Sequence, residues 1–308
     1  TIDLNKYDFY GPSKYPTRLK SALGLDIHND NLTKLITVQE GIPYSLDSMV
    51  SLVKLFLIED SFYLVSDINK EYTQIITYNL INGEIKTEII EQASSELEKS
   101  NSFLTKQNLF QIAVNTKTLN VKITDIKTKE VMKQYEISKK DSLYFANGPI
   151  RQRGGRYTKY RELEKTSQFL RKVGNGSPAI YVNEKENQYE ISIGSVDDIE
   201  DGLIAAIAYL NPVTAVATFG ALTVYANPVA LAMIKASNSK AVYINNILDS
   251  EFKLTNQEEK DNIFYIINDY IKKKDLKRYA ASDIFIYQDS YLFGMLDKKT
   301  KMYILRKF

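Results

Sequence analysis

The most basic stretch of the sequence lies at residues 151–161, which hold half of all the arginines in the chain. Guanidinium groups bind oxyanions in pairs and tyrosine rings offer stacking faces, so the stretch could contact a phosphate, a carboxylated glycan or a nucleic-acid strand. It lacks the glycine pattern of a phosphate-binding loop. The favoured interpretation is a solvated connector whose charges meet Glu162 and Glu164. The candidate contact residues for a partner or an anion are Arg151, Arg153, Arg156, Tyr157, Tyr160 and Arg161.

Cysteine is absent and His28 is the single histidine, which removes most nucleophilic and metal chemistry. Without thiols the chain has no disulfide and no Cys-based metal site, and one imidazole cannot supply a multi-histidine site. His28 lies in a polar stretch between Asp26 and Asp30, which is more typical of a solvated loop than of a general base. The sequence therefore predicts no cofactor, no metal and no catalytic residue.

Carboxylates and tyrosines are what remains for an enzyme to use. The densest acidic cluster lacks the alternating oxygen ligands and final glutamate of a calcium loop, and we interpret it as a solubilising link. It comprises Asp197, Asp198, Glu200 and Asp201. The abundant tyrosines fit half-buried strand positions, although exposed ones can contact peptides or sugars. A glycan- or peptide-processing enzyme that relies on these groups is accordingly kept as an alternative to a binding protein.

One segment differs from the rest because it carries no charged side chain from Gly202 to Ile234. It is long enough to cross a bilayer as one helix, but Asn-Pro pairs at 211–212 and 227–228 interrupt it. Asparagine is a good N-cap and proline suits the first helical turn, so each pair should begin a new helix. The prediction is an apolar helical insertion at about 199–238, with helices at roughly 202–210, 212–226 and 228–236.

Three interpretations of this insertion stay open. Helices that are apolar all round must be buried in protein or lipid, and the simplest interpretation is packing against the rest of the domain. The second is an exposed docking surface for a partner protein, because monomers rarely expose apolar patches of this size. The third is membrane contact through 202–235, which acidic residues precede and lysines follow. The predicted apolar contact residues are Leu210, Val213, Phe219, Leu222, Val229 and Leu231.

Short apolar runs separated by turn signals predict antiparallel strands from about residue 53 onward. A similar set of runs returns after about 46 to 47 residues, and a repeat of this length made of strands is typical of a propeller blade. The spacing also predicts that Ile76 and Ile123 occupy equivalent, inward-facing positions. The strands are expected at 62–65, 74–78 and 85–89 in the first unit, and at 109–112, 121–125 and 130–131 in the second.

The same pattern continues later in the chain. A hairpin is expected at 179–182 and 189–193, and three C-terminal strands at 283–287, 290–294 and 302–305. The predicted fold class is β-rich, either all-β or α+β, with antiparallel meanders and helical insertions. Two arrangements of the meanders stay open, a propeller-like ring and another β-rich arrangement such as a large β-sandwich. With 308 residues the chain can bury a large core, and we expect a single domain over 1–308.

Two helices are expected between the strands. Thr255 and Glu258 form a capping box, and apolar residues then recur at helical spacing, which predicts an amphipathic helix over about 256–273. The other helix is expected at roughly 158–173, closed by the Gly-Asn-Gly sequence at 174–176.

The predicted function is a non-catalytic binding or scaffold protein of a bacterial cell envelope that contacts a partner protein. The first residue is Thr1 and the chain is rich in Lys, Asn, Ile and Tyr, which favours an exported, processed protein over a cytoplasmic one. The formal net charge of +2 argues against a nucleic-acid partner. Two alternatives are kept: the carboxylate- and tyrosine-based enzyme, and a membrane-docked factor that uses the apolar insertion.

Overall fold

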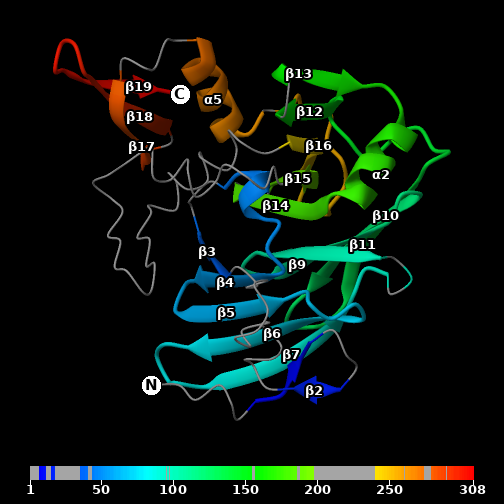
Figure 1. Cartoon of the computed structure of the whole chain (residues 1–308). Coiled ribbons are helices and arrows are strands. Elements are labelled where there is room, and N and C mark those ends of the chain that lie inside the picture. The colour runs from blue at the N-terminus through cyan, green and yellow to red at the C-terminus, as the bar shows by residue number, and fades with distance from the viewer. Residues whose placement is uncertain are drawn as a thin grey trace.

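The computed structural model confirms a β-rich chain built from antiparallel sheets (Figure 1). Two meanders occupy one half of the molecule, and two further sheets with the helices occupy the other. A closed propeller ring is not detected among the described residues. These residues are 7–11, 15–17, 35–40, 44–94, 96, 98–154, 157–185, 188–197, 240–259, 261–273, 279–288 and 290–308.

The first sheet is a four-stranded antiparallel meander with one more strand at its edge. Its order is β3-β4-β5-β6-β7, and β3 runs parallel to β4. A short pair, β1 (Phe9–Tyr10) and β2 (Pro16–Thr17), lies beside it. The strands of the sheet are β3 (Leu35–Gln39), β4 (Val53–Ile58), β5 (Ser61–Ser66), β6 (Tyr72–Asn79) and β7 (Ile85–Glu91).

The second sheet is another four-stranded meander, in the order β11-β10-β9-β8. Its strands are β8 (Lys99–Leu104), β9 (Asn108–Val114), β10 (Thr118–Asp125) and β11 (Val131–Ser138). The two meanders share one cross-strand register. The residues that face one another across the four strands are Phe56, Tyr63, Thr77 and Lys86 in the first meander and Phe103, Phe110, Ile123 and Lys133 in the second.

This register corrects the predicted equivalence of Ile76 and Ile123. The counterpart of Ile123 is Thr77, because the connection from β5 to β6 is one residue longer than the one from β9 to β10. A shift of one residue turns a side chain to the other face of a strand. Ile123 accordingly lies in the main core, whereas Ile76 is buried on the opposite face against Phe9.

The third sheet has the order β13-β12-β16-β15-β14 and is antiparallel throughout. The hairpin expected at 179–193 forms its β14–β15 edge. The predicted apolar insertion lies outside the described residues, but the two residues that flank it are neighbours: Asp197 pairs with Lys240 across β15 and β16, and their side chains form an ion pair of 3.0 Å. The strands are β12 (Ile150–Gly154), β13 (Tyr157–Leu163), β14 (Ser177–Lys185), β15 (Gln188–Asp197) and β16 (Lys240–Leu248).

Both predicted helices begin later than expected. The helix predicted from about residue 158 is α2 (Thr166–Asn175), because residues 157–163 pair with β12 as strand β13. The helix predicted from about residue 256 is α5 (Ile263–Lys273), and the side chain of Asn262 accepts the backbone N–H of Phe264 at 3.0 Å in place of the expected capping box. The expected C-terminal strands form a separate three-stranded sheet of β17 (Tyr279–Tyr287), β18 (Ser290–Asp297) and β19 (Tyr303–Lys307).

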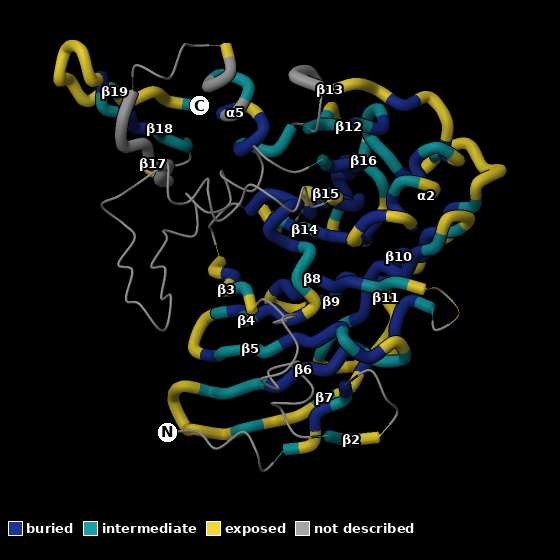
Figure 2. The backbone as a smooth tube through the Cα atoms, viewed as in Figure 1, coloured by how far each residue is buried: buried dark blue, intermediate teal, exposed yellow. Residues whose placement is uncertain are grey.

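One continuous hydrophobic core extends from the first sheet to the C-terminal one. Figure 2 shows its densest part where β8–β10 face β14–β16. Apolar residues of α2 and α5 close it, with Phe169, Leu170, Phe264 and Ile267 fully buried. Ile266, which the sequence places on the same apolar stripe of α5, is instead 40% exposed.

A buried polar bridge joins the first strands of the two meanders. Lys54 on β4 is fully buried, and its Nζ donates to Oδ1 of Asn101 on β8 at 2.9 Å. The Asp67 carboxylate lies 3.8 Å from the same ammonium and accepts the hydroxyls of Ser102 and Thr73 at 2.7 Å each. A buried charge is tolerated only when it is paired and hydrogen-bonded, so these contacts fix how β4 and β8 lie together.

Lys54 should make the stability of the protein depend on pH. Burial lowers the pKa of Lys54 from 10.5 to about 8, and Asp67 offsets only part of the shift. Below pH 8 both the folded and the unfolded chain hold this proton. Between pH 8 and 10.5 only the unfolded chain still holds it, so the free energy of unfolding should rise with pH in that window.

Lys54→Met removes this titration, and the other groups stay common to both proteins. We expect the free energy of unfolding of the wild type minus that of the variant to increase by about 1–3 kcal/mol between pH 7 and pH 10. Urea unfolding followed by circular dichroism at each pH measures the difference. A difference that stays constant or decreases would contradict the assignment.

Candidate functional site

The arginines predicted to contact a partner lie on a strand, and acidic residues of the same chain face them. Arg151 and Arg153 are on β12, a strand inside the third sheet rather than a solvated connector. Arg151 pairs with Glu259 at 2.5 Å and approaches Asp261 at 3.5 Å. Arg153 pairs with Asp261 and, at 2.9 Å, with Asp269 of α5. For Arg151 and Arg153, the ion-pair partners are therefore these three acids in place of the predicted Glu162 and Glu164.

Tyrosine rings enclose this arginine cluster, which comprises Arg151, Arg153 and their three acidic partners. Arg153 lies over the rings of Tyr160 and Tyr265 at 5.2 and 5.1 Å, and its Nε donates to the Tyr243 hydroxyl at 2.8 Å. Burial opposes the charge of Arg153, but Tyr243 and Asp261 outweigh it and raise the pKa of Arg153. These contacts join the third sheet to α5, which is a structural role.

The other predicted contact residues are placed only in part. Tyr160 is 44% exposed on β13 and lies near both guanidinium groups of the cluster, and Arg161 is exposed on the same strand. Arg156, the side chain of Tyr157 and His28 lie outside the described residues. So do all the predicted apolar contact residues, Leu210, Val213, Phe219, Leu222, Val229 and Leu231.

The described residues lack two features that would point to a membrane or a metal. No helix there is long and apolar enough to span a membrane. Within the same ranges, no group of three or more acidic or histidine side chains is placed to hold a metal ion.

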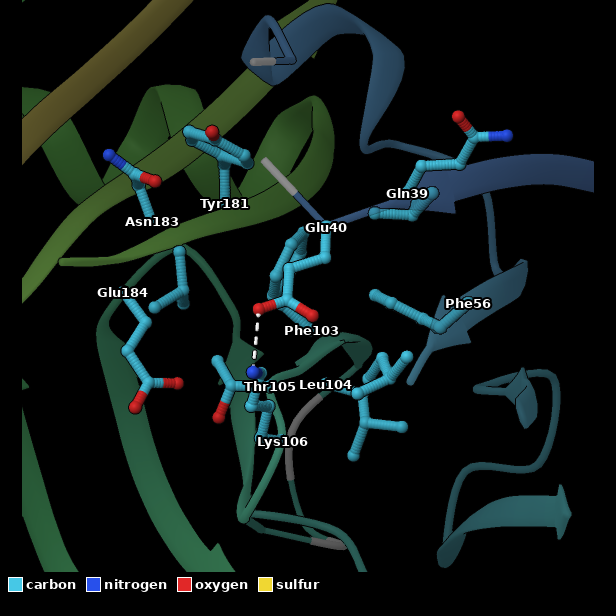
Figure 3. A pocket seen from close by; sticks show the side chains of 13 residues that line it. Gln39, Glu40, Phe56, Phe103, Leu104, Thr105, Lys106, Tyr181, Asn183 and Glu184 are labelled. Carbon is cyan, nitrogen blue, oxygen red and sulfur yellow. Dashed lines mark ion pairs between the residues drawn. The ribbon is translucent and has the colours of Figure 1, made fainter. Parts of the chain in front are cut away.

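A pocket that sequence reasoning missed opens where three sheets meet (Figure 3). We call it the junction pocket, and its volume is about 370 Å³. One wall comes from β3 and β4, the second from the end of β8, and the third from β14. The lining residues are Val38, Gln39, Glu40, Phe56, Ile58, Phe103, Leu104, Thr105, Lys106, Tyr181, Val182, Asn183 and Glu184.

The floor of the junction pocket is aromatic. Phe56 meets Phe103 edge-on with ring centroids 5.2 Å apart, and Phe103 meets Tyr181 in the same way at 5.5 Å. Side chains two residues apart on a strand share a face. Phe56 and Phe103 therefore follow Lys54 and Asn101 on the same faces of β4 and β8, so the buried polar bridge positions the floor.

The rim of the junction pocket is charged and exposed. Lys106 Nζ lies 3.0 Å from Glu40 and 3.5 Å from Glu59. Glu184 stands on β14 on the other side of the opening (Figure 3). Partial burial raises the pKa of Glu184, with Lys106 opposing the shift and Glu40 adding to it. The pocket thus combines an apolar interior with a rim rich in carboxylates.

One signal in the sequence could have located part of this pocket. A Phe-Leu pair lies within the last three residues of the first strand of each meander, beginning at Phe56 and at Phe103. A charged residue follows three positions after each phenylalanine, at Glu59 and Lys106. The wall from β14 has no such mark, because it comes from a segment far away in the sequence.

The comparisons with known proteins add little to this geometry. No protein-family model matches the chain, and no curated protein matches it. A Pyrococcus horikoshii acylaminoacyl peptidase, solved in an orthorhombic crystal form, is similar to 78% of this chain at 11% identity and a TM-score of 0.23. The match covers 27% of that chain. A TM-score this low supports neither a shared fold nor a shared activity.

The structural role of the arginine cluster can be tested by truncation. Arg153→Ala would leave Asp261 and Asp269 partly buried without their main counter-charge, and we expect the free energy of unfolding to fall by about 2–3 kcal/mol. Arg171→Ala, on the exposed side of α2, is the matched control and should change it by no more than about 0.5 kcal/mol. Equal stability of the two variants would instead mean that Arg153 is held for an external ligand.

Proposed function

We propose that this is a non-catalytic binding protein whose junction pocket takes an apolar side chain from a segment of a partner protein. The observation that carries the proposal is the pocket itself, with its aromatic floor, charged rim and volume of about 370 Å³. Ligand sites are usually apolar hollows with a few polar groups that fix orientation. Ligand pockets range from about 300 to 1,000 Å³, so this one is small. Its volume suits one or two side chains better than a large cofactor.

Strand edges around the pocket support recognition of an extended segment. Within the described residues, β3 pairs only with β4 and β14 pairs only with β15. A segment laid along such an edge can pair with its backbone and point alternate side chains into a neighbouring pocket. Gln39, the last residue of β3, and Glu40 after it line the junction pocket, so a segment along this strand would reach the pocket.

A carboxylate-based enzyme is the second candidate, and one observation favours it. Glu40 and Glu184 line the same hollow, and the pKa of Glu184 is raised chiefly by burial. Enzymes that use two acids need one charged and one protonated carboxylate. The Glu40 carboxylate is already engaged in an ion pair with Lys106, so it is not free to act as the second catalytic acid. Binding is therefore the better supported proposal. Turnover of a glycan or peptide that disappears in Glu184→Gln would reverse this order.

The location and the further contacts of the protein rest on sequence alone. The bacterial cell envelope stays our proposed location because of composition. Contact with a partner or a membrane through residues 202–235 also stays a prediction, since this stretch lies outside the described residues.

The binding role of the junction pocket can be tested by filling it. Asn183 lines the pocket on β14, where its side chain donates to Glu190 of β15 at 2.9 Å, and Asn183→Trp puts an indole in this wall. Ile81→Trp adds the same side chain at a position that is 77% exposed on the β6–β7 turn. We expect peptides selected on the wild type from a displayed random heptapeptide library to bind Ile81→Trp unchanged and Asn183→Trp at least about tenfold more weakly.

Both variants must first match the wild type in thermal melting. Affinities are then measured by fluorescence polarisation with synthetic copies of the selected peptides. Equal binding by Asn183→Trp and the wild type would contradict the proposal.

A further inference from the structure

We infer that the junction pocket selects a segment in which a basic residue neighbours the apolar one, and that Glu184 is the counter-ion for this basic residue. The inference rests on the proposed function and names the chemistry of the partner.

The single cation among the pocket-lining residues is engaged within the chain. Lys106 contacts two carboxylates, Glu40 at 3.0 Å and Glu59 at 3.5 Å. An incoming anion would have to displace one of them and would meet Glu184 as well. The opening is therefore unfavourable for acidic ligands.

Glu184 is the carboxylate at the opening that has no ion-pair partner among the described residues. Among the described residues no cation lies within ion-pairing distance of it, whereas Glu40 and Glu59 share Lys106. Three carboxylates against one ammonium give the opening a negative charge. Such a surface attracts cations and suppresses anionic competitors, which yields specificity more than affinity.

The position of Glu184 sets the spacing of the two groups in the ligand. Val182, two residues before Glu184 on β14, lines the interior together with Tyr181. Glu184 stands at the rim and points away from Asn183, on the side of Lys106 (Figure 3). An apolar side chain on the floor and a cation at Glu184 therefore belong to adjacent or nearly adjacent residues. The long stems of lysine and arginine can cover the apolar edge between them.

The test uses the same random heptapeptide library on the whole protein. Wild type should enrich peptides with lysine or arginine beside phenylalanine, leucine or another apolar residue. Glu184→Lys should remove that preference and favour aspartate or glutamate. Glu130→Lys, a matched charge reversal at an exposed position on the β10–β11 turn, should select the same peptides as the wild type.

Affinities then quantify the contact. We expect Glu184→Gln to bind the best wild-type peptide about fivefold more weakly than the wild type does at low salt. The difference in affinity should shrink at high salt, as for a partly exposed ion pair. Enrichment of apolar peptides with no basic preference, unchanged in Glu184→Lys, would overturn this inference and leave the pocket's binding role standing. Selection of the same peptides by Asn183→Trp would overturn the binding role itself.

Discussion

The contact between Lys54 and Asn101 is the interaction on which the rest of this structure depends most. It joins the first strands of two meanders that share a register but no backbone hydrogen bonds. Two apolar surfaces could slide past each other, whereas a buried ammonium must keep its acceptors. We interpret the polar bridge as the device that fixes β4 against β8, and with them the edge-on pair Phe56 and Phe103.

The third wall of the junction pocket, which comes from β14, depends on contacts made by α5 and the arginine cluster. The arginine cluster ties the third sheet to α5, and the residues around α5 contact the segment that precedes β4: Tyr265 donates to Asp47 at 3.0 Å, and Asn262 donates to the carbonyl of Tyr44 at 2.9 Å. The Tyr44 hydroxyl accepts the backbone N–H of Gln39 at 2.9 Å, and its ring lies 6.5 Å from that of Tyr181. Tyr44 thus connects β3 with β14 across the pocket.

The sequence predicts many of the strands because alternation and turn residues are local signals, but it gives no strand at β8, β12, β13 or β16. It misplaces what depends on distant contacts. Residues 157–163, expected at the start of a helix, form a strand because β12 is available for pairing. The arginines of β12 find acids more than a hundred residues away, which spacing along the chain cannot reveal. The error between Ile76 and Ile123 comes from a single extra residue in one connection.

Most of the junction pocket lies beyond sequence reasoning for the same reason, since its walls come from three sheets. The most direct test of its role is a methyl NMR spectrum of the whole protein, recorded with and without a peptide selected on the wild type. Our account predicts that the largest shifts occur at Val38, Ile58, Leu104 and Val182, which line the pocket. Shifts confined to methyl groups of residues 202–235 or of the C-terminal sheet, with these four unchanged, would contradict it.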